Sequence, residues 1–277
     1  MLARALSEKR AIRLTIIILA VLPALPLSAP KAAGKIVPSY LGRIQENTPR
    51  SEAEEVAQLA SRLDSSDEQE RIDAAVKLAM LGTPLAIPAL TSALDDREER
   101  VRAIAIDGLV MIGDPQVLPL LTNRLERDRS VFVRKSAAYA IGRLGSRLGT
   151  PALLAALKDK NAELRGAAVV ALSKYRDPAA VPGLIQALSD KDSFVRAHAA
   201  LALGNNGRAA IQATPHLIRL LDSDPSNEVK REAATALGYI GDPSALESLE
   251  RAKLSSDYLL SQAALSAIKR IRESRES

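Results

Sequence analysis

The chain has 277 residues, contains neither cysteine nor tryptophan, and carries a formal net charge of +5. Without cysteine, disulfides, thiolate metal sites and thiol nucleophiles are excluded. Aromatic residues make up only 3% of the chain and hydrophobic residues 47%. The core must therefore be built from Ala and aliphatic side chains, which suit closely packed helices.

The N-terminal segment has the pattern of an export signal. Basic residues up to Arg13 precede an apolar run over residues 14–22, and prolines then interrupt a stretch of small residues. Residues 1–29 also hold three of the five net positive charges, so the rest of the chain is too nearly neutral for charge to indicate a nucleic-acid partner. We expect an exported protein that is either cleaved after Ala29 or Ala33, and so periplasmic or otherwise extracytoplasmic, or anchored to the membrane by this segment.

Residues 30–50 are predicted to be a linker, because Pro and Gly recur there among polar residues without a sustained period. Ser51 then begins a helix. Glu52, Glu54 and Glu55 lie in its first turn, where the helix dipole favours acidic side chains. The folded array is expected over residues 51–277.

A short sequence motif recurs about every 31 residues from Glu70 to the C-terminus. Most copies begin with an aliphatic residue followed by a basic one, and in every copy an aliphatic residue stands eight positions after the start. The clearest copies begin at Val101, Val133, Leu164 and Val195, whereas the first begins with Glu70-Arg71 and the last with Leu260-Ser261. The starts of successive copies are separated by 31, 32, 31, 31, 34 and 31 residues. A fixed period of this length is typical of a solenoid, in which each unit buries its apolar face against its neighbours.

Each unit is predicted to contain two helices. The first, for example Ser130 to Leu144, has aliphatic and Ala side chains at helical spacing. Glycines that can adopt a left-handed C-cap end these helices, at Gly82, Gly113, Gly145, Gly207 and Gly241. The second helix begins near a periodic proline, which loses no hydrogen bond in a first helical turn; these are Pro88, Pro119, Pro151, Pro182 and Pro215.

These features together resemble HEAT repeats, of the variety also found in phycobilin lyase subunits. The acidic turn, the Val-Arg pair, the Leu-Gly-x-Ile-Gly-Asp-Pro stretch at residues 237–243 and the proline-initiated second helix carry the resemblance, over roughly residues 58–272. It implies an all-α fold, a right-handed α-α superhelix (solenoid) of about seven HEAT-like helix-pair repeats. It also implies a non-catalytic protein–protein interaction scaffold or adaptor, because the family mostly binds other proteins.

Two columns of charge follow the period. We interpret them as a structural ladder, as in the resembled family, formed by Arg71, Arg102, Arg134, Arg165, Arg196 and Lys230 beside Asp96, Asp128, Asp159, Asp190 and Asp224.

The resemblance implies that the second helices line the concave face and bind the partner there. The outward residues of these helices make a polar to mildly basic groove that suits an acidic or polar segment, although a solvated face without a dedicated ligand is the alternative. The candidate residues are Asn123, Arg124, Arg127, Gln186, His216, Arg219 and Arg251.

Two further features vary between the copies. Phe132 and Phe194 each precede the Val of their unit and mark one edge, where they either pack against the neighbouring repeat or contact a partner. The fifth unit is longer than the others, with its extra residues between Arg208 and Thr214.

The sequence offers little for catalysis. His198 and His216 have no metal-ligand spacing, and neither a Gly-x-Ser-x-Gly elbow nor a phosphate-binding loop occurs. We expect no cofactor, no metal and no nucleic-acid partner. The alternative is a lyase-type enzyme subunit or chromophore-protein chaperone resembling phycobilin lyase subunits.

Overall fold

The computed structural model describes residues 51–276, so the predicted leader (1–29) and linker (30–50) lie outside the described residues. Every regular element within residues 51–276 is helical. None of the described helices is long and apolar enough to cross a membrane. The predicted all-α repeat fold is confirmed.

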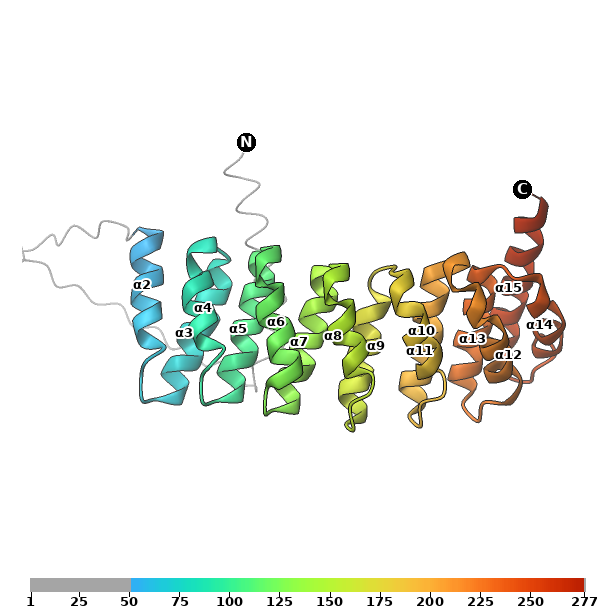
Figure 1. Ribbon diagram of the computed structural model, residues 1–277, viewed down its shortest axis with the longest axis horizontal. Coiled ribbons are helices and arrows are strands. Elements are labelled where there is room, and N and C mark those ends of the chain that lie inside the picture. The colour runs from blue at the N-terminus through green and yellow to red at the C-terminus, as the bar shows by residue number, and fades with distance from the viewer. Residues whose placement is uncertain (1–50, 277) are drawn as a thin grey trace, which may run out of the picture. The chain divides into compact units, whose positions relative to one another are not determined.

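First and second helices alternate along the array (Figure 1). The first helices are α3 (Glu68–Leu81), α5 (Glu99–Ile112), α7 (Val131–Leu144), α9 (Ala162–Ser173), α11 (Ser193–Asn206), α13 (Asn227–Ile240) and α15 (Tyr258–Glu276). The second helices are α2 (Glu52–Arg62), α4 (Ile87–Ala93), α6 (Leu118–Arg127), α8 (Thr150–Ala156), α10 (Val181–Ala187), α12 (Thr214–Ser223) and α14 (Leu246–Ala252).

Two opposite edges of the array are defined by its connections. Turns from each second helix to the next first helix lie along the lower side of Figure 1, and we call this side the turn edge. Loops from each first helix to its second helix lie along the upper side, the loop edge.

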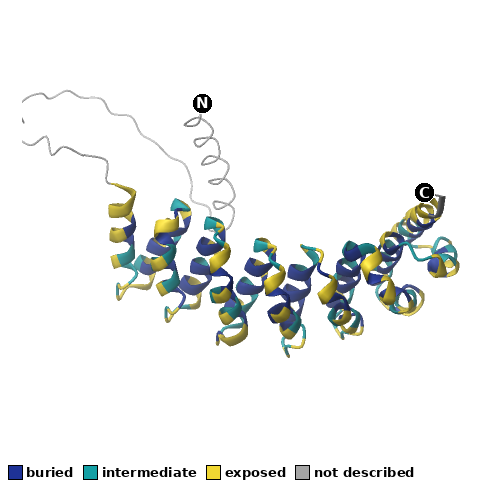
Figure 2. Ribbon diagram, turned by 45° about the horizontal axis from the view of Figure 1, so that its top comes forward, coloured by how far each residue is buried: buried dark blue, intermediate teal, exposed yellow. Residues whose placement is uncertain are grey.

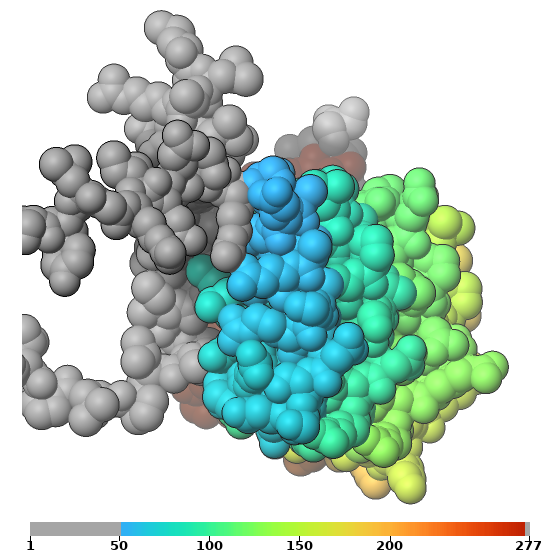
Figure 3. Space-filling view, turned by 90° about the vertical axis from the view of Figure 1, so that its left-hand side faces the viewer, coloured from blue at the N-terminus to red at the C-terminus, as the bar shows by residue number. Residues whose placement is uncertain are grey.

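The array begins with the predicted cap. The hydroxyl of Ser51 accepts a hydrogen bond from the amide of Glu54 at 3.3 Å, and the Glu54 carboxylate accepts one from the amide of Ser51 at 2.9 Å. This reciprocal capping box satisfies two amides that have no partner within the helix. Helices α2 and α3 form the N-terminal end of the array (Figure 3).

The loops differ from the prediction in two respects. A short 3-10 turn precedes each second helix from α4 onward. The periodic prolines stand after this turn, in the first turn of the α-helix itself, in α4, α6, α8, α10 and α12. Four of the predicted glycine caps are left-handed, but Gly207 has φ +55° and ψ −135°, outside the left-handed helical region. Gly207 thus ends α11 as predicted, but not in the left-handed helical conformation, and the extra residues of the fifth unit continue directly as a 3-10 segment, Gly207–Ala213.

The core lies between the two layers of helices, where the buried side chains gather (Figure 2). Each unit contributes one aliphatic residue from its first helix and one from its second, and all of these are at most 1% exposed. The first-helix residues are Leu78, Leu109, Ile141, Leu172, Leu203 and Leu237; the second-helix residues are Leu90, Leu121, Leu153, Leu184, Leu217 and Leu249. Burial of these side chains is the main apolar contribution to stability.

Neighbouring first helices approach one another very closely. A Cβ placed on Gly142 would lie 2.8 Å from the Cα of Ala171, and one on Gly238 would lie 2.7 Å from the Cα of Ala267. Gly204 meets Ala236 in the same way, at 2.9 Å. The backbones can pack at this distance only because one partner has no side chain and the other has a methyl group.

In the first and last of the first helices, α3 and α15, a lysine replaces one of the small residues of this close contact. The position of Ala171 and Ala267 is taken by Lys77 in α3, and the position of Gly142 is taken by Lys269 in α15. Both lysines are exposed. A long charged side chain at this point excludes equally close packing of another first helix.

Replacement of Gly142 by Ala tests the close approach. Alanine favours a helix by up to about 1 kcal/mol over glycine, yet we expect Gly142→Ala to destabilise the protein by about 1–3 kcal/mol because the added methyl group meets backbone. Urea unfolding measures the change. Gly166→Ala is the matched control: its Cβ would meet only the ring of Phe194, at 3.2 Å, and a half-exposed ring can move. Equal effects of the two variants would contradict the interpretation.

Candidate functional site

Ion pairs join each turn to the next along the turn edge. The Arg near the start of one first helix reaches the Asp in the following turn, and we call each pair a rung. The shortest N–O distances are 2.8 Å for Arg71–Asp96, 2.8 Å for Arg102–Asp128, 3.4 Å for Arg134–Asp159, 2.7 Å for Arg165–Asp190 and 2.7 Å for Arg196–Asp224. Each predicted Arg thus lies beside the Asp of the next repeat.

A rung consists of more than one ion pair. Arg165 donates from Nε and Nη2 to the two carboxylate oxygens of Asp190, and from Nη1 to the carbonyl of Asp159 at 2.9 Å. Asp190 also accepts a hydrogen bond from the amide of Asp192 at 2.9 Å. One guanidinium therefore holds its own turn and the next turn in a fixed relation. The planar fork of Arg allows this, whereas the point charge of Lys does not.

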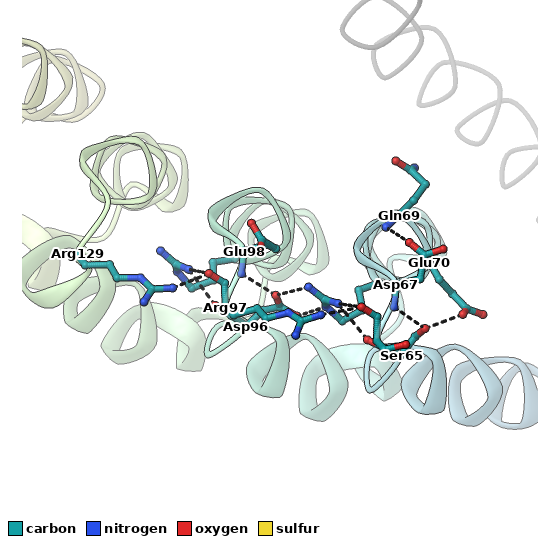
Figure 4. A network of polar contacts seen from close by, with 11 residues as sticks. Ser65, Asp67, Gln69, Glu70, Asp96, Arg97, Glu98 and Arg129 are labelled. Carbon is teal, nitrogen blue, oxygen red and sulfur yellow. Dashed lines mark hydrogen bonds and ion pairs between the residues drawn. The ribbon is translucent and has the colours of Figure 1, made fainter.

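A second series of bonds accompanies the rungs at their N-terminal end. Arg97, which follows the rung residue Asp96, donates to the carbonyl of Ser66 at 2.7 Å, and Arg129 donates in turn to the carbonyl of Arg97. Figure 4 shows this network around Asp96. These exposed bonds repeat at the period of the rungs and also connect successive turns.

The predicted continuation of the ladder at Lys230 is wrong. The next ion pair joins Arg231, one residue later, to Asp257 at 3.3 Å. Ser255 occupies the place in this turn that Asp holds in the preceding ones. Donor and acceptor have therefore both shifted, because a lysine could not make the forked contact and no carboxylate stands at the usual place.

Three rung carboxylates, those of Asp128, Asp190 and Asp224, have lowered pKa values. Burial alone would raise the pKa of Asp190, but the hydrogen bonds from Arg165 and from the amide of Asp192 outweigh it and hold the pKa below the ordinary range. The pKa values of Asp128 and Asp224 are lowered for the same reasons. The hydrogen bond to Asp190 likewise raises the pKa of Arg165. Both members of a rung remain charged at neutral pH.

The predicted partner-binding residues are spread over four second helices. Gln186, His216 and Arg219 lie together near α10 and α12, whereas Asn123, Arg124 and Arg127 lie on α6 and Arg251 on α14. Two of the cations are bound to acids within the array. Arg124 pairs with Asp95 at 2.6 Å, and Arg251 pairs with Asp222 at 3.0 Å and Glu247 at 2.8 Å. These pairs neutralise much of the basic character that was predicted for α6 and α14.

A groove crosses the turn ends of α8, α10 and α12. It consists of two cavities, of about 280 Å³ and 460 Å³, which share Asp190 as a lining residue. The first is lined by Leu154, Leu157, Lys158, Gly183, Gln186, Ala187 and Asp190, and the second by Leu188, Ser189, Asp190, Arg196, His216, Arg219, Leu220, Ser223, Asp224 and Pro225. The rungs at Asp190 and Asp224 thus help to form its walls.

The groove combines aliphatic lining residues with cations. Lys158 and Arg219 have no acidic partner within residues 51–276; Arg219 lies 2.7 Å from His216 Nδ1 instead. Lys158 and Gly183 were not among the predicted residues. The only signal for Lys158 was its place beside the acidic turn, and Gly183 could not be found from sequence, because its role depends on Leu154 lying 2.4 Å from where its Cβ would be.

The residues at the predicted edge differ in their contacts: Phe194 packs against other side chains, whereas Phe132 is half-exposed. Phe194 stacks on His198 with ring centroids 3.9 Å apart and lies over Gly166 of the preceding first helix. Phe132 remains 50% exposed. Glu163, at the same place in the fourth unit, forms an ion pair with Lys135 of the preceding helix. This edge therefore contributes contacts between repeats at Glu163 and Phe194.

Within residues 51–276, no group of three or more His, Asp or Glu side chains is placed to hold a metal ion. His198 lies against Phe194 and His216 beside Arg219.

The fold defines a class, the solenoids of paired α-helices whose neighbouring units are joined by a regular series of contacts. The family model for HEAT repeats matches residues 56–142, 123–204, 150–224 and 214–276. The chain belongs to the HEAT-repeat family.

Solved structures share the fold at low identity. The complex of CpcE and CpcF of phycocyanin lyase from Nostoc sp. PCC7120 is 24% identical, with 86% of this chain and 93% of that chain covered and a TM-score of 0.49. Human deoxyhypusine hydroxylase is 24% identical over 79% and 84% of the two chains, with a TM-score of 0.40. A designed armadillo repeat protein is 21% identical over 78% and 99%, with a TM-score of 0.46. No curated protein matches the sequence.

Removal of one interior guanidinium tests the contribution of the rungs. Arg165→Ala leaves the Asp190 carboxylate, which is 11% exposed, without its counter-charge. We therefore expect a loss of about 2–3 kcal/mol in the free energy of unfolding at neutral pH, below the full penalty for a completely buried charge. Because the pKa of Asp190 is lowered in the folded state, the rung stabilises above the ordinary Asp pKa and is lost as the pH falls through the lowered value. The difference between the variant and the wild type should therefore shrink below about pH 4.

Arg231→Ala is the matched control, since its side chain is 30% exposed and its ion pair is longer, at 3.3 Å. It should cost about 1 kcal/mol or less. Denaturant titrations at several pH values measure both variants. A pH-independent loss for Arg165→Ala, or an equal loss for Arg231→Ala, would contradict the assignment.

Proposed function

We propose that this protein is a non-catalytic scaffold of the cell envelope that binds a protein partner across its second helices. The groove over α8, α10 and α12 carries the proposal. It comprises two neighbouring cavities that share Asp190, with aliphatic lining residues for contact area and two cations without acidic partners. Membership of the HEAT-repeat family supports a role in binding proteins.

The chemistry of the groove selects the partner segment. Leu154, Leu157 and Leu220 suit aliphatic side chains, and Lys158 and Arg219 suit carboxylates. The two cations lie in separate cavities on either side of Asp190, so a matching segment needs acids on both sides of an apolar centre. Opposite charge at the rim sets the rate of association and the choice of partner more than the affinity.

Site-specific photo-crosslinking in cells tests this surface. A photoreactive residue at Gln186 should capture a discrete partner, whereas one at Tyr139, which is 43% exposed on a first helix, should not. Lys158→Glu with Arg219→Glu should reduce the Gln186 adduct by about tenfold or more, because like charges across an interface cost several kcal/mol.

The matched control is Lys77→Glu with Arg100→Glu, on the first helices α3 and α5. Both are exposed cations that form no ion pair within residues 51–276 and lie outside the groove lining. An adduct at Tyr139 but none at Gln186 would contradict the proposal, as would equal losses in the two double variants. Reversal of Arg124 or Arg251 is a poor test, because it also breaks ion pairs within the array.

The envelope location rests on the sequence of the leader. A basic segment followed by the apolar run over residues 14–22 directs export and then either is cleaved or anchors the chain. N-terminal sequencing of the protein from envelope fractions should find Pro30 or Gly34 first if the leader is cleaved, or the uncleaved chain in the membrane fraction if it is retained. Recovery of an uncleaved chain from the cytoplasm would contradict export.

A further inference from the structure

The loop edge has a one-sided charge between α7 and α12. This part of the edge contains five basic residues and one acidic residue. It is formed by residues 142–151, 173–182 and 205–215. The basic residues are Arg143, Arg147, Lys174, Arg176 and Arg208, and the acid is Asp177.

The acid does not neutralise these cations. Asp177 is buried, and its carboxylate accepts hydrogen bonds from the hydroxyl of Thr150 at 2.5 Å and from the amide of Ala179 at 3.1 Å. Arg143 lies 3.5 Å from Asp107. The other four cations are exposed and form no ion pair within residues 51–276. Arg208 lies near enough to Asp242 of the following loop for the two charges to attract each other, so Arg147, Lys174 and Arg176 are the cations without an acidic neighbour.

Aliphatic side chains project among these cations. Leu148 follows Arg147 in the 3-10 turn of its loop and is 82% exposed. Ile211 lies in the longer 3-10 segment that begins beside Arg208 and is 42% exposed. Neither side chain contributes to the buried core, so both are free to enter an apolar environment outside the protein.

The turn edge of the same repeats differs in composition. Its cations Arg127, Arg129, Lys158, Lys160 and Lys191 alternate with the rung aspartates and with Glu126, Glu163 and Asp192. Charge of one sign is therefore a property of the loop edge of these repeats.

We propose that the loop edge between α7 and α12 docks on an anionic bilayer surface. Guanidinium and ammonium groups attract acidic lipid headgroups, and each basic residue near such a surface contributes about 1 kcal/mol. Leu148 and Ile211 would enter the boundary between headgroups and acyl chains, as apolar side chains of peripheral proteins do. A single-stranded nucleic acid fits this edge less well, because its bases stack on exposed aromatic side chains. A duplex would meet the cations through its phosphates but would offer no apolar environment to Leu148 and Ile211.

This surface is distinct from the partner groove. None of the five basic residues of the loop edge lines the groove, and most of the groove's lining residues lie toward the turn ends of α8, α10 and α12. The inference does not rest on the proposed scaffold function.

Single-cysteine reporters test the orientation, since the chain has no cysteine of its own. Leu148→Cys and Leu254→Cys place an environment-sensitive dye on opposite edges at matched exposures of 82% and 81%. Full-length protein is mixed with vesicles of equal parts phosphatidylcholine and phosphatidylserine, or of phosphatidylcholine alone. We expect a blue shift at residue 148 with the anionic vesicles only, and none at residue 254.

Charge variants test the cations through vesicle co-sedimentation. Neutralising the loop edge with Arg147→Gln, Lys174→Gln, Arg176→Gln and Arg208→Gln should lower binding to anionic vesicles by about tenfold or more. Neutralising the turn edge with Arg127→Gln, Lys158→Gln, Lys160→Gln and Lys191→Gln removes the same charge and should have a much smaller effect.

Four results would overturn the proposal. They are equal losses in the two charge variants, an unchanged affinity of the loop-edge variant, a dye response that is the same with neutral vesicles or at residue 254, and a response at residue 148 to DNA but not to vesicles.

Discussion

The rung between an arginine and the aspartate of the following turn is the contact on which the rest of the array depends. A buried guanidinium and carboxylate stabilise the fold only when every donor and acceptor has a partner. Arg165 meets this condition by bonding both oxygens of Asp190 and a carbonyl of its own turn. The rung therefore specifies how far one repeat is rotated and displaced from the next, in addition to holding the two together.

The close approach of the first helices complements the rungs. Gly142 against Ala171 brings two backbones together near the loop ends of the helices, while Arg134 and Asp159 connect the same repeats at the turn edge. Contacts at both ends of the helices leave neighbouring repeats little freedom to pivot. The turn ends of α8, α10 and α12 are held in register as a result, and the groove is built from these ends. Binding surfaces in a solenoid follow from such nearest-neighbour geometry.

The sequence predicted what recurs with the period. The first and second helices, the glycine caps and the alignment of Arg165 with Asp190 follow from spacing, because each identical unit meets identical neighbours. Contacts that depart from the period were harder to predict from the sequence. Arg231 replaces Lys230 because the acceptor also moves to Asp257, which only a folded turn reveals. The pairing of Arg124 with Asp95, and the place of Lys158 in the groove, depend on side chains of adjacent repeats meeting in space. The period of one chain does not specify those contacts.

Hydrogen exchange at the turn amides tests the central role of the rungs most directly. The amides of Ser130, Asp192 and Ser226 donate to rung aspartates at 2.9 Å. The amide of Gln116 donates to Asp114 with the same geometry, but no arginine holds that carboxylate in an ion pair. If the rungs hold the repeats together, the three turn amides should exchange nearly as slowly as the neighbouring first helices, and Gln116 much faster. Exchange of all four at similar fast rates would contradict this role.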